Sequence, residues 1–133
     1  MLKKVILCVD DEQIILKSLR DQITRNFGNQ YCCELAESAD EAWEIIEELH
    51  EDEIDILIIV SDWLMPEMKG DEFLIKVHQQ FPKITKVLLT GQADEEAIER
   101  TQQNANLHRY LPKPWDEATL IEVLKSGLER MNE

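Results

Sequence analysis

The chain has 133 residues, with 28 acidic side chains against 14 basic ones and a formal net charge of −14. This length suits one domain, and a hydrophobic content of 44% is enough for an apolar core without metal or disulfide cross-links. The negative charge argues against nucleic-acid binding, and no apolar run reaches the ~20 residues of a membrane span, so we expect a cytoplasmic, membrane-free protein.

The first predicted strand, Lys4 to Val9, is a near-continuous apolar run that ends on three consecutive acids, Asp10, Asp11 and Glu12. Apolar residues at helical spacing then predict a helix from about Gln13 to Asn26. A single acid would be explained by the favourable charge at a helix N-terminus, but three acids exceed what a cap requires.

A short second strand is predicted from Tyr31 to Ala36. Ser38 is a candidate N-cap, with Glu41 three residues later, for a helix that extends to about His50. The cysteines are odd in number and lack metal-ligand spacing, which favours three buried, reduced thiols: Cys8, Cys32 and Cys33.

The third strand has the strongest pattern in the chain. Ile56 to Val60 are continuously apolar and mostly β-branched, which is typical of a strand buried on both faces in a parallel sheet. The run stops on Ser61 and Asp62, which places a carboxylate at the carboxyl end of a central strand. A loop and a third helix follow, and this helix ends before Phe81.

The fourth strand, Lys86 to Leu89, stops on Thr90, and a helix with a thin apolar stripe is expected from Asp94. The fifth strand, Arg109 to Leu111, leads into Pro112, Lys113 and Pro114, and the last helix is expected from near Asp116. That helix has no clear stop signal, which leaves open a continuation of the natural chain into another domain.

The alternation of strand and helix, five times over, predicts an α/β fold: a doubly wound five-stranded parallel sheet with helices on both faces. The carboxyl ends of parallel strands lie at one edge of the sheet, where open α/β sheets place their ligands. Six side chains are expected to meet at this edge: Asp10, Asp11, Glu12, Asp62, Thr90 and Lys113.

Carboxylates this close repel one another by roughly 4 kcal/mol per pair at about 4 Å in a surface-like dielectric, which a fold tolerates when a cation lies among them. Oxygen ligands suit Mg²⁺, or alternatively Mn²⁺, better than zinc. A nearby ammonium group and hydroxyl would complete a site for a phosphoryl group. The remaining nucleophile is a carboxylate, so the expected covalent species is an aspartyl phosphate.

Four short segments carry the pattern: Val9-Asp10-Asp11-Glu12, Ser61-Asp62-Trp63-Leu64-Met65-Pro66-Glu67-Met68-Lys69-Gly70, Leu89-Thr90-Gly91 and Leu111-Pro112-Lys113-Pro114. In this order and at these spacings they resemble the receiver domain of two-component response regulators, over essentially the whole chain. The resemblance implies a single receiver domain, residues 1–133, with a flavodoxin-like (βα)5 fold and strand order 2-1-3-4-5. It also implies a phosphoacceptor that takes a phosphoryl group from a histidine kinase or phosphotransfer protein. Such a domain catalyses only its own phosphorylation and dephosphorylation.

The resemblance assigns metal ligands and a phosphorylated residue. Asp62 matches the phosphoacceptor and also contacts the metal. Asp11 matches the direct metal ligand, Asp10 assists through water, and the backbone carbonyl of Leu64 is a further ligand.

The resemblance also assigns a switch. Thr90 matches the switch hydroxyl, Lys113 the phosphate-binding lysine and Tyr110 the aromatic side chain that changes rotamer on activation. The Lys113-Pro114 peptide bond is cis in the family, a conformation that has a modest energetic cost only before proline. The face made by the fourth helix, fifth strand and fifth helix would then control an output domain, an effector protein or a homodimer.

Two positions depart from the chemotaxis members of the family. The residues two after Asp62 and two after Thr90 flank the route of the hydrolytic water, and here they are Leu64 and Gln92. Because an apolar side chain does not position water, we expect slow self-dephosphorylation.

Two other classes of protein fit the pattern less well. A hydrolase of the haloacid dehalogenase type would carry Asp-x-Asp-x-Thr on its first strand, but here Asp10 and Asp11 are followed by no such threonine. A receiver-like interaction module that is not phosphorylated usually lacks the acid, the hydroxyl or the lysine, whereas Asp62, Thr90 and Lys113 are all present.

Overall fold

The computed structural model describes residues 4–91 and 95–130. Five strands alternate with five helices in these residues. In chain order the elements are β1 (Lys4–Val9), α1 (Gln13–Phe27), β2 (Cys32–Ala36), α2 (Ala39–Glu51), β3 (Asp55–Asp62), α3 (Gly70–Gln80), β4 (Thr85–Thr90), α4 (Glu95–Ala105), β5 (Arg109–Pro112) and α5 (Glu117–Arg130).

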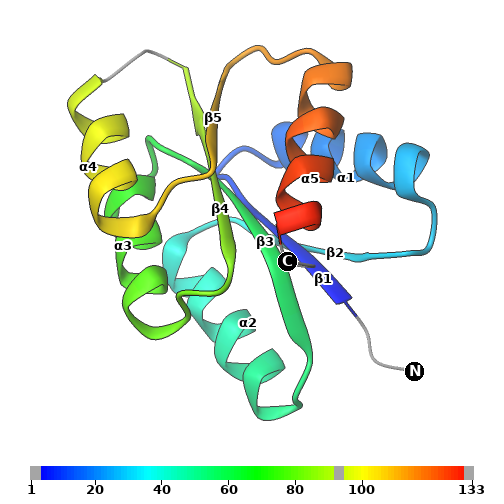
Figure 1. Ribbon diagram of the computed structural model, residues 1–133, viewed down its shortest axis with the longest axis horizontal. Coiled ribbons are helices and arrows are strands. Elements are labelled where there is room, and N and C mark those ends of the chain that lie inside the picture. The colour runs from blue at the N-terminus through cyan, green and yellow to red at the C-terminus, as the bar shows by residue number, and fades with distance from the viewer. Residues whose placement is uncertain (1–3, 92–94, 131–133) are drawn as a thin grey trace.

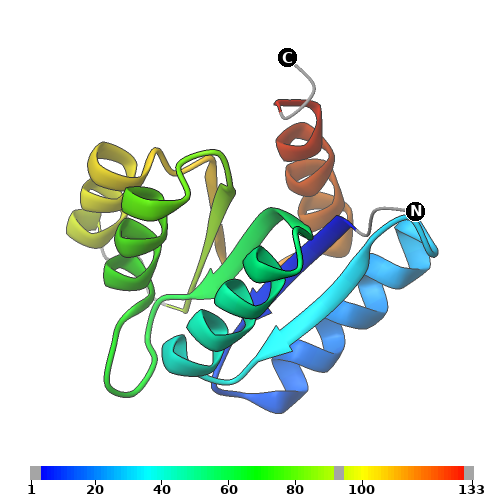
Figure 2. The same cartoon turned by 90° about the horizontal axis from the view of Figure 1, so that it is seen from below.

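The strands form one parallel sheet in the order β2-β1-β3-β4-β5, which confirms the predicted topology. Helices α1 and α5 cover one face, and α2, α3 and α4 cover the other (Figures 1 and 2). Both faces of β1, β3 and β4 are therefore buried, which explains their unbroken apolar runs.

The core consists of two apolar layers separated by the sheet. Ile6 and Ile58 face the side of α1 and α5, whereas Leu7 and Ile59 face the side of α2 and α3. Alternate residues of one strand point to opposite faces, so neighbouring residues enter different layers. Phe73 of α3 is fully buried in the second layer.

The structure corrects the expectation for the cysteines. None of the three forms a disulfide, but only Cys8 is buried, while Cys33 is half-buried and Cys32 is exposed. The reason is the strand order: β2 is an edge strand, so its first residues have a neighbouring strand on one side only.

The side chain of a lysine in β4 is buried. Lys86 of β4 is 2% exposed, and its Nζ lies 2.8 Å from Nδ1 of His78 and donates to the carbonyl oxygen of Pro82 at 3.2 Å. Burial, and then the nearby charge of Arg130, lowers the pKa of Lys86 to about 8. The sequence pattern gave no indication of this buried ammonium group.

Candidate functional site

Backbone hydrogen bonds extend the sheet past the strand ends and thereby position the polar residues that follow. The amide of Asp10 donates to Ala36 across β1 and β2 at 3.0 Å, and the amide of Lys113 donates to Thr90 across β5 and β4 at 2.7 Å. The amide of Trp63, directly after β3, donates to the carbonyl oxygen of Leu89 at 2.8 Å. These bonds hold the predicted residues at one edge of the sheet.

Three carboxylates meet at this edge. Asp10, Asp11 and Asp62 each offer an oxygen within 4.8 Å of the others. Asp10 and Asp62 are buried and Asp11 is exposed, so the cluster opens to solvent on one side. Asp10 is fixed in place because its Oδ1 accepts a hydrogen bond from the backbone amide of Glu12 at 2.8 Å.

The ammonium group of Lys113 lies between two of these carboxylates. Its Nζ is 2.8 Å from Oδ2 of Asp10 and 3.0 Å from Oδ1 of Asp62, and its side chain is 17% exposed. Burial alone would lower the pKa of Lys113, but the hydrogen bonds to Asp10 and Asp62 outweigh it and leave the pKa raised. The lysine therefore stays protonated and supplies a fixed positive charge.

The carboxyl group of Asp62 has a raised pKa. Burial, together with the charges of Asp10 and Asp11, raises the pKa of Asp62 to about 6, although the hydrogen bond and the charge of Lys113 oppose this rise. A carboxylate that burial and like charges destabilise gains stability from an added cation.

Gly70, the first residue of α3, closes the connection between β3 and this helix. The amide of Gly70 donates to the carbonyl oxygen of Trp63 at 2.7 Å. A Cβ atom at Gly70 would lie 2.0 Å from the carbonyl oxygen of Asp62, which is closer than any side chain allows. Only glycine fits, and the close approach fixes the backbone of Asp62 relative to α3.

The remaining predicted residues differ in their exposure to solvent. Thr90 is 3% exposed at the end of β4. Leu64 lies in the β3–α3 connection, and its side chain is 62% exposed. Gln92 lies outside the described residues, as does Asp94, and the helix is described from Glu95 onward.

Tyr110 is 47% exposed and lies on the same face of the sheet as Thr90. In the register of β4 and β5, Tyr110 pairs with Leu88, two residues before Thr90. The Lys113-Pro114 peptide is cis, as the resemblance implied.

Sequence reasoning missed two interactions beside the site. Lys69 places its ammonium group 5.2 Å from the ring centroid of Trp63, a cation–π contact. Arg100 of α4 pairs with the buried Asp71 of α3. The sequence offered one signal for the second pair: Asp71 is an acidic residue at the start of the third helix, between Gly70 and the apolar Phe73.

The fold and the site together define a class of protein. It is a doubly wound α/β domain with an acidic cluster, a half-buried lysine and a threonine at the carboxyl edge of its sheet, which is the edge where such folds bind ligands. None of the helices within the described residues is long and apolar enough to cross a membrane.

Comparison with known proteins gives the family. The response regulator receiver domain profile matches residues 6–125, and the chain belongs to this family. The signal receiver domain of an HD domain-containing protein from Pseudomonas fluorescens Pf-5 is 29% identical, with a TM-score of 0.88 over 98% of both chains. Phosphorylation-dependent switching in two-component systems is the function of the family, and receiver domains bind Mg²⁺ at an acidic pocket.

The curated relatives differ in length. The hydrogenase transcriptional regulatory protein HoxA of Cupriavidus necator is 29% identical over 93% of this chain, which spans only 24% of the HoxA sequence. A chemotaxis protein CheY homolog of Campylobacter jejuni is 27% identical over 92% of this chain and 91% of its own. Similar domains therefore occur both within long regulators and nearly alone.

Proposed function

We propose that this receiver domain accepts a phosphoryl group on the carboxylate of Asp62 from a histidine kinase or phosphotransfer protein. In the transfer, an oxygen of Asp62 forms a bond to phosphorus as the bond from phosphorus to the donor nitrogen breaks. The observation that carries the proposal is the position of Lys113, whose ammonium group contacts Asp62 and Asp10 at the open edge of the sheet.

The donor set fits a divalent cation such as Mg²⁺ or Mn²⁺. Asp11 and Asp62 would bind it directly, Asp10 through water, and the backbone carbonyl of Leu64 would be a further ligand. Three carboxylates within 4.8 Å of one another form an all-oxygen site, which hard cations prefer. When bound, the metal offsets charge on the transferred phosphoryl group.

Two residues of the chain itself serve the phosphorylated state. The ammonium group of Lys113 would pair with a phosphoryl oxygen, and the hydroxyl of Thr90 would donate a hydrogen bond to another. Drawing Thr90 inward vacates space beside β4, and Tyr110 on the neighbouring strand is placed to move into it.

The output surface in this proposal is the face formed by α4, β5 and α5, through which phosphorylation changes binding to an output domain, an effector protein or a second copy. The proposal treats residues 1–133 as one cytoplasmic receiver domain, with α5 leading to any domain that follows. Its catalysis is limited to its own phosphorylation and dephosphorylation. To move the domain from 1:99 to 99:1 in favour of its active conformation, phosphorylation must stabilise that conformation over the inactive one by about 5.5 kcal/mol.

The test of the phosphoacceptor is incorporation of phosphate from a small-molecule acyl phosphate, with and without Mg²⁺. Wild-type protein should acquire one acid-labile phosphoryl group in the presence of Mg²⁺, and Asp62→Asn should acquire none while keeping its melting transition. Asp55→Asn, at the opposite end of β3, is the matched control and should be phosphorylated normally. Full incorporation by Asp62→Asn would overturn the assignment.

The switch is tested in the same preparation. Thr90→Ala should still incorporate phosphate, but its change in sedimentation or partner affinity on phosphorylation should be blunted. A full conformational response in Thr90→Ala would show that Thr90 does not couple the site to the output face.

A further inference from the structure

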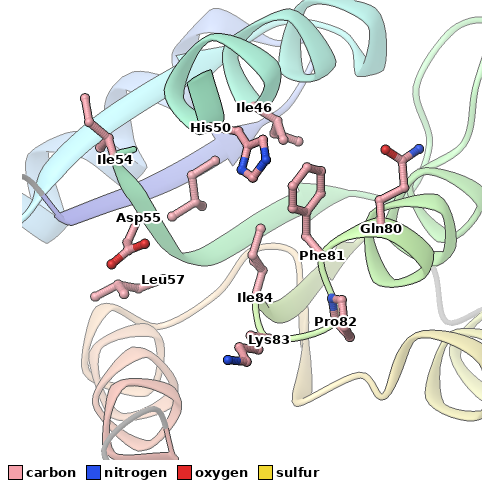
Figure 3. A pocket seen from close by; sticks show the side chains of 11 residues that line it. Ile46, His50, Ile54, Asp55, Leu57, Gln80, Phe81, Pro82, Lys83 and Ile84 are labelled. Atoms are coloured by element: carbon pink, nitrogen blue, oxygen red, sulfur yellow. The ribbon is translucent and has the colours of Figure 1, made fainter. Parts of the chain in front are cut away.

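A cavity of about 470 Å³ lies at the amino end of β3 and β4, on the opposite edge of the sheet from Asp62. Figure 3 shows side chains that converge on it from the end of α2, the start of β3 and the α3–β4 connection. Its walls are mainly apolar, with Ile46, Ile54, Ile56, Phe81, Pro82 and Ile84 among the lining residues. We call this cavity the basal groove.

The basal groove leaves apolar surface in contact with solvent. Ile54 and Phe81 are only half-buried, although both pack against the core. The rings of His50 and Phe81 lie edge to face, with centroids 5.1 Å apart, and form one wall between α2 and the α3–β4 connection (Figure 3). A volume of this size falls in the range of about 300–1,000 Å³ found for ligand sites.

The rim of the basal groove on the side of α2 is strongly acidic. Asp55 lines the groove, and Asp52 and Glu53 lie between the lining residues His50 and Ile54. Glu47 and Glu51 each follow a lining residue by one position on α2 and lie four apart, so they form one stripe beside it. All five carboxylates are exposed, and none forms an ion pair with another described residue.

Two helix ends add to this negative potential. The last turns of α2 and α3 contain the lining residues His50 and Gln80, so the partially negative ends of both helix dipoles lie at the groove. Lys83 is a single cation among the lining residues. The electrostatics of the groove therefore favour a positively charged occupant.

The acidic rim is ordered rather than loose. The amides of Asp52, Glu53 and Ile54 donate to Glu48, His50 and Leu49 at 3.1, 3.1 and 2.9 Å and close the end of α2 onto β3. A rim already held in one conformation costs less ordering entropy when a partner binds.

The mode of binding follows from the sheet. β3 and β4 are interior strands with a neighbour on each side, so no free strand edge is available to which an extended peptide could pair. A partner must therefore insert side chains, which is how amphipathic helices bind apolar grooves.

We propose that the basal groove is a docking site for a basic amphipathic helix of a partner protein. Apolar side chains of that helix enter the groove between His50 and Phe81, and its Lys or Arg side chains meet the carboxylates of the rim. This surface is separate from the face of α4, β5 and α5, and the proposal does not depend on phosphorylation of Asp62.

Three synthetic peptides of about 14 residues, roughly four helical turns, provide the probes. The first contains Leu and Lys with all Leu on one helical face, the second has the same composition in scrambled order, and the third replaces every Lys with Glu. Binding is measured by titration calorimetry, and the site is located by amide chemical shifts of isotope-labelled protein. The amphipathic basic peptide should bind at least about tenfold more tightly than the other two, with shifts confined to the groove.

Two variants test the two contributions separately. Phe81→Ala removes one apolar wall, and Glu47→Gln/Glu51→Gln/Glu53→Gln removes rim charge at exposed positions. Each should weaken binding about tenfold, and the rim variant should also reduce the dependence of affinity on salt. Glu95→Gln/Glu96→Gln/Glu99→Gln, which removes the same charge from α4, is the control and should bind as the wild type does.

Several results would overturn the proposal. Equal binding of amphipathic and scrambled peptides, shifts spread over the whole surface, or equal weakening by the α4 control would each show non-specific attraction to an acidic protein. Self-association in sedimentation that shifts the same groove residues would show that the occupant is a second copy of the chain.

Discussion

Arg100 of α4 donates both its Nε and one terminal nitrogen to the same oxygen, Oδ2, of Asp71 on α3, with an Nε–Oδ2 distance of 3.0 Å. The Asp71 side chain is 1% exposed and that of Arg100 is 50% exposed, so a buried carboxylate is paired with a half-solvated guanidinium. The other oxygen of Asp71, Oδ1, is buried without a hydrogen-bond partner among the described residues.

The ion pair matters because α4 has little apolar surface with which to hold itself in place. Its buried residues are Ala97, Thr101 and Ala105. All three are small, and the hydroxyl of Thr101 is used within the helix, where it donates to the carbonyl oxygen of Ala97 at 2.7 Å. The thin stripe predicted from the sequence is therefore confirmed, and the Asp71–Arg100 pair ties this helix to α3, beside which it lies (Figures 1 and 2).

Arg100→Met should lower the free energy of unfolding by about 1–3 kcal/mol, because it leaves the Asp71 carboxylate buried without this cation. Urea denaturation measures the change. Arg109→Met, at an exposed position on β5, is the control and should change stability by less than about 0.5 kcal/mol. Addition of Asp71→Asn to Arg100→Met should recover part of the loss; a double variant less stable than Arg100→Met would contradict this account.

Saturating Mg²⁺ should raise the melting temperature of the wild type, because a ligand that binds only the folded state stabilises it by mass action, by about 2.7 kcal/mol at a hundredfold excess over Kd. Asp11→Ala should lose most of this shift, since it removes the exposed member of the acidic cluster. Asp21→Ala, an exposed acid on α1, is the control. Trp63 directly follows Asp62 and should report the titration by fluorescence; an unchanged Mg²⁺ affinity in Asp11→Ala would place the metal elsewhere.

Leu64→Asn should accelerate loss of phosphate from the phosphorylated protein by about tenfold, which corresponds to about 1.4 kcal/mol in the barrier. The Leu64 side chain is 62% exposed in the β3–α3 connection, so an amide at this position is free to hydrogen-bond a water molecule, which a leucine is not. The measurement is the decay of the acid-labile phosphate after removal of the donor. Leu64→Ala controls for loss of bulk, and an equal or slower decay in Leu64→Asn than in the wild type would count against the idea.

Lys86→Met should stabilise the fold at about pH 7, because a charged group with a pKa lowered to about 8 is unfavourable in the folded state. In the unfolded chain Lys86 has its ordinary pKa of 10.5. Between about pH 8 and pH 10.5 the unfolded chain therefore binds more protons than the folded chain, so the stability of the wild type rises with pH in this window. The advantage of Lys86→Met, up to about 3 kcal/mol, should therefore shrink above about pH 8. Denaturation at several pH values, with the exposed Lys76→Met as control, tests this; a difference that is constant with pH would refute it.

Much of the fold was predictable from the sequence because the local signals agreed with the final structure. The apolar run before Asp62 became the interior strand β3, and Ser38 caps α2 by accepting a hydrogen bond from the amide of Glu41 at 3.1 Å. The reciprocal half of the predicted capping box is displaced by one residue: the Glu41 carboxylate accepts from the amide of Glu37 rather than Ser38.

The features that could not be predicted depend on which elements become neighbours. Asp71 and Arg100 are 29 residues apart and meet only because α3 packs beside α4. Lys86 looked like the first residue of a strand, and its burial depends on the α3–β4 connection that carries Pro82. The exposure of Cys32 follows from the place of β2 at the edge of the sheet, which the resemblance implied but the apolar pattern of the strand does not show.

β3 runs from Asp55 in the basal groove to Asp62 in the acidic cluster, so one eight-residue strand separates the two sites. At about 3.3 Å per residue, its ends are roughly 23 Å apart, well beyond the ~8 Å over which charges act through physiological salt. The charge of a phosphoryl group at one end is therefore largely screened at the other. Both ends can be occupied at the same time. If occupancy of the groove and of Asp62 are coupled, the coupling must pass through the backbone and packing of this strand. It must also be reciprocal: a partner that binds more tightly to the phosphorylated chain stabilises the phosphorylated chain by the same factor, which would make the domain a detector of two coincident inputs.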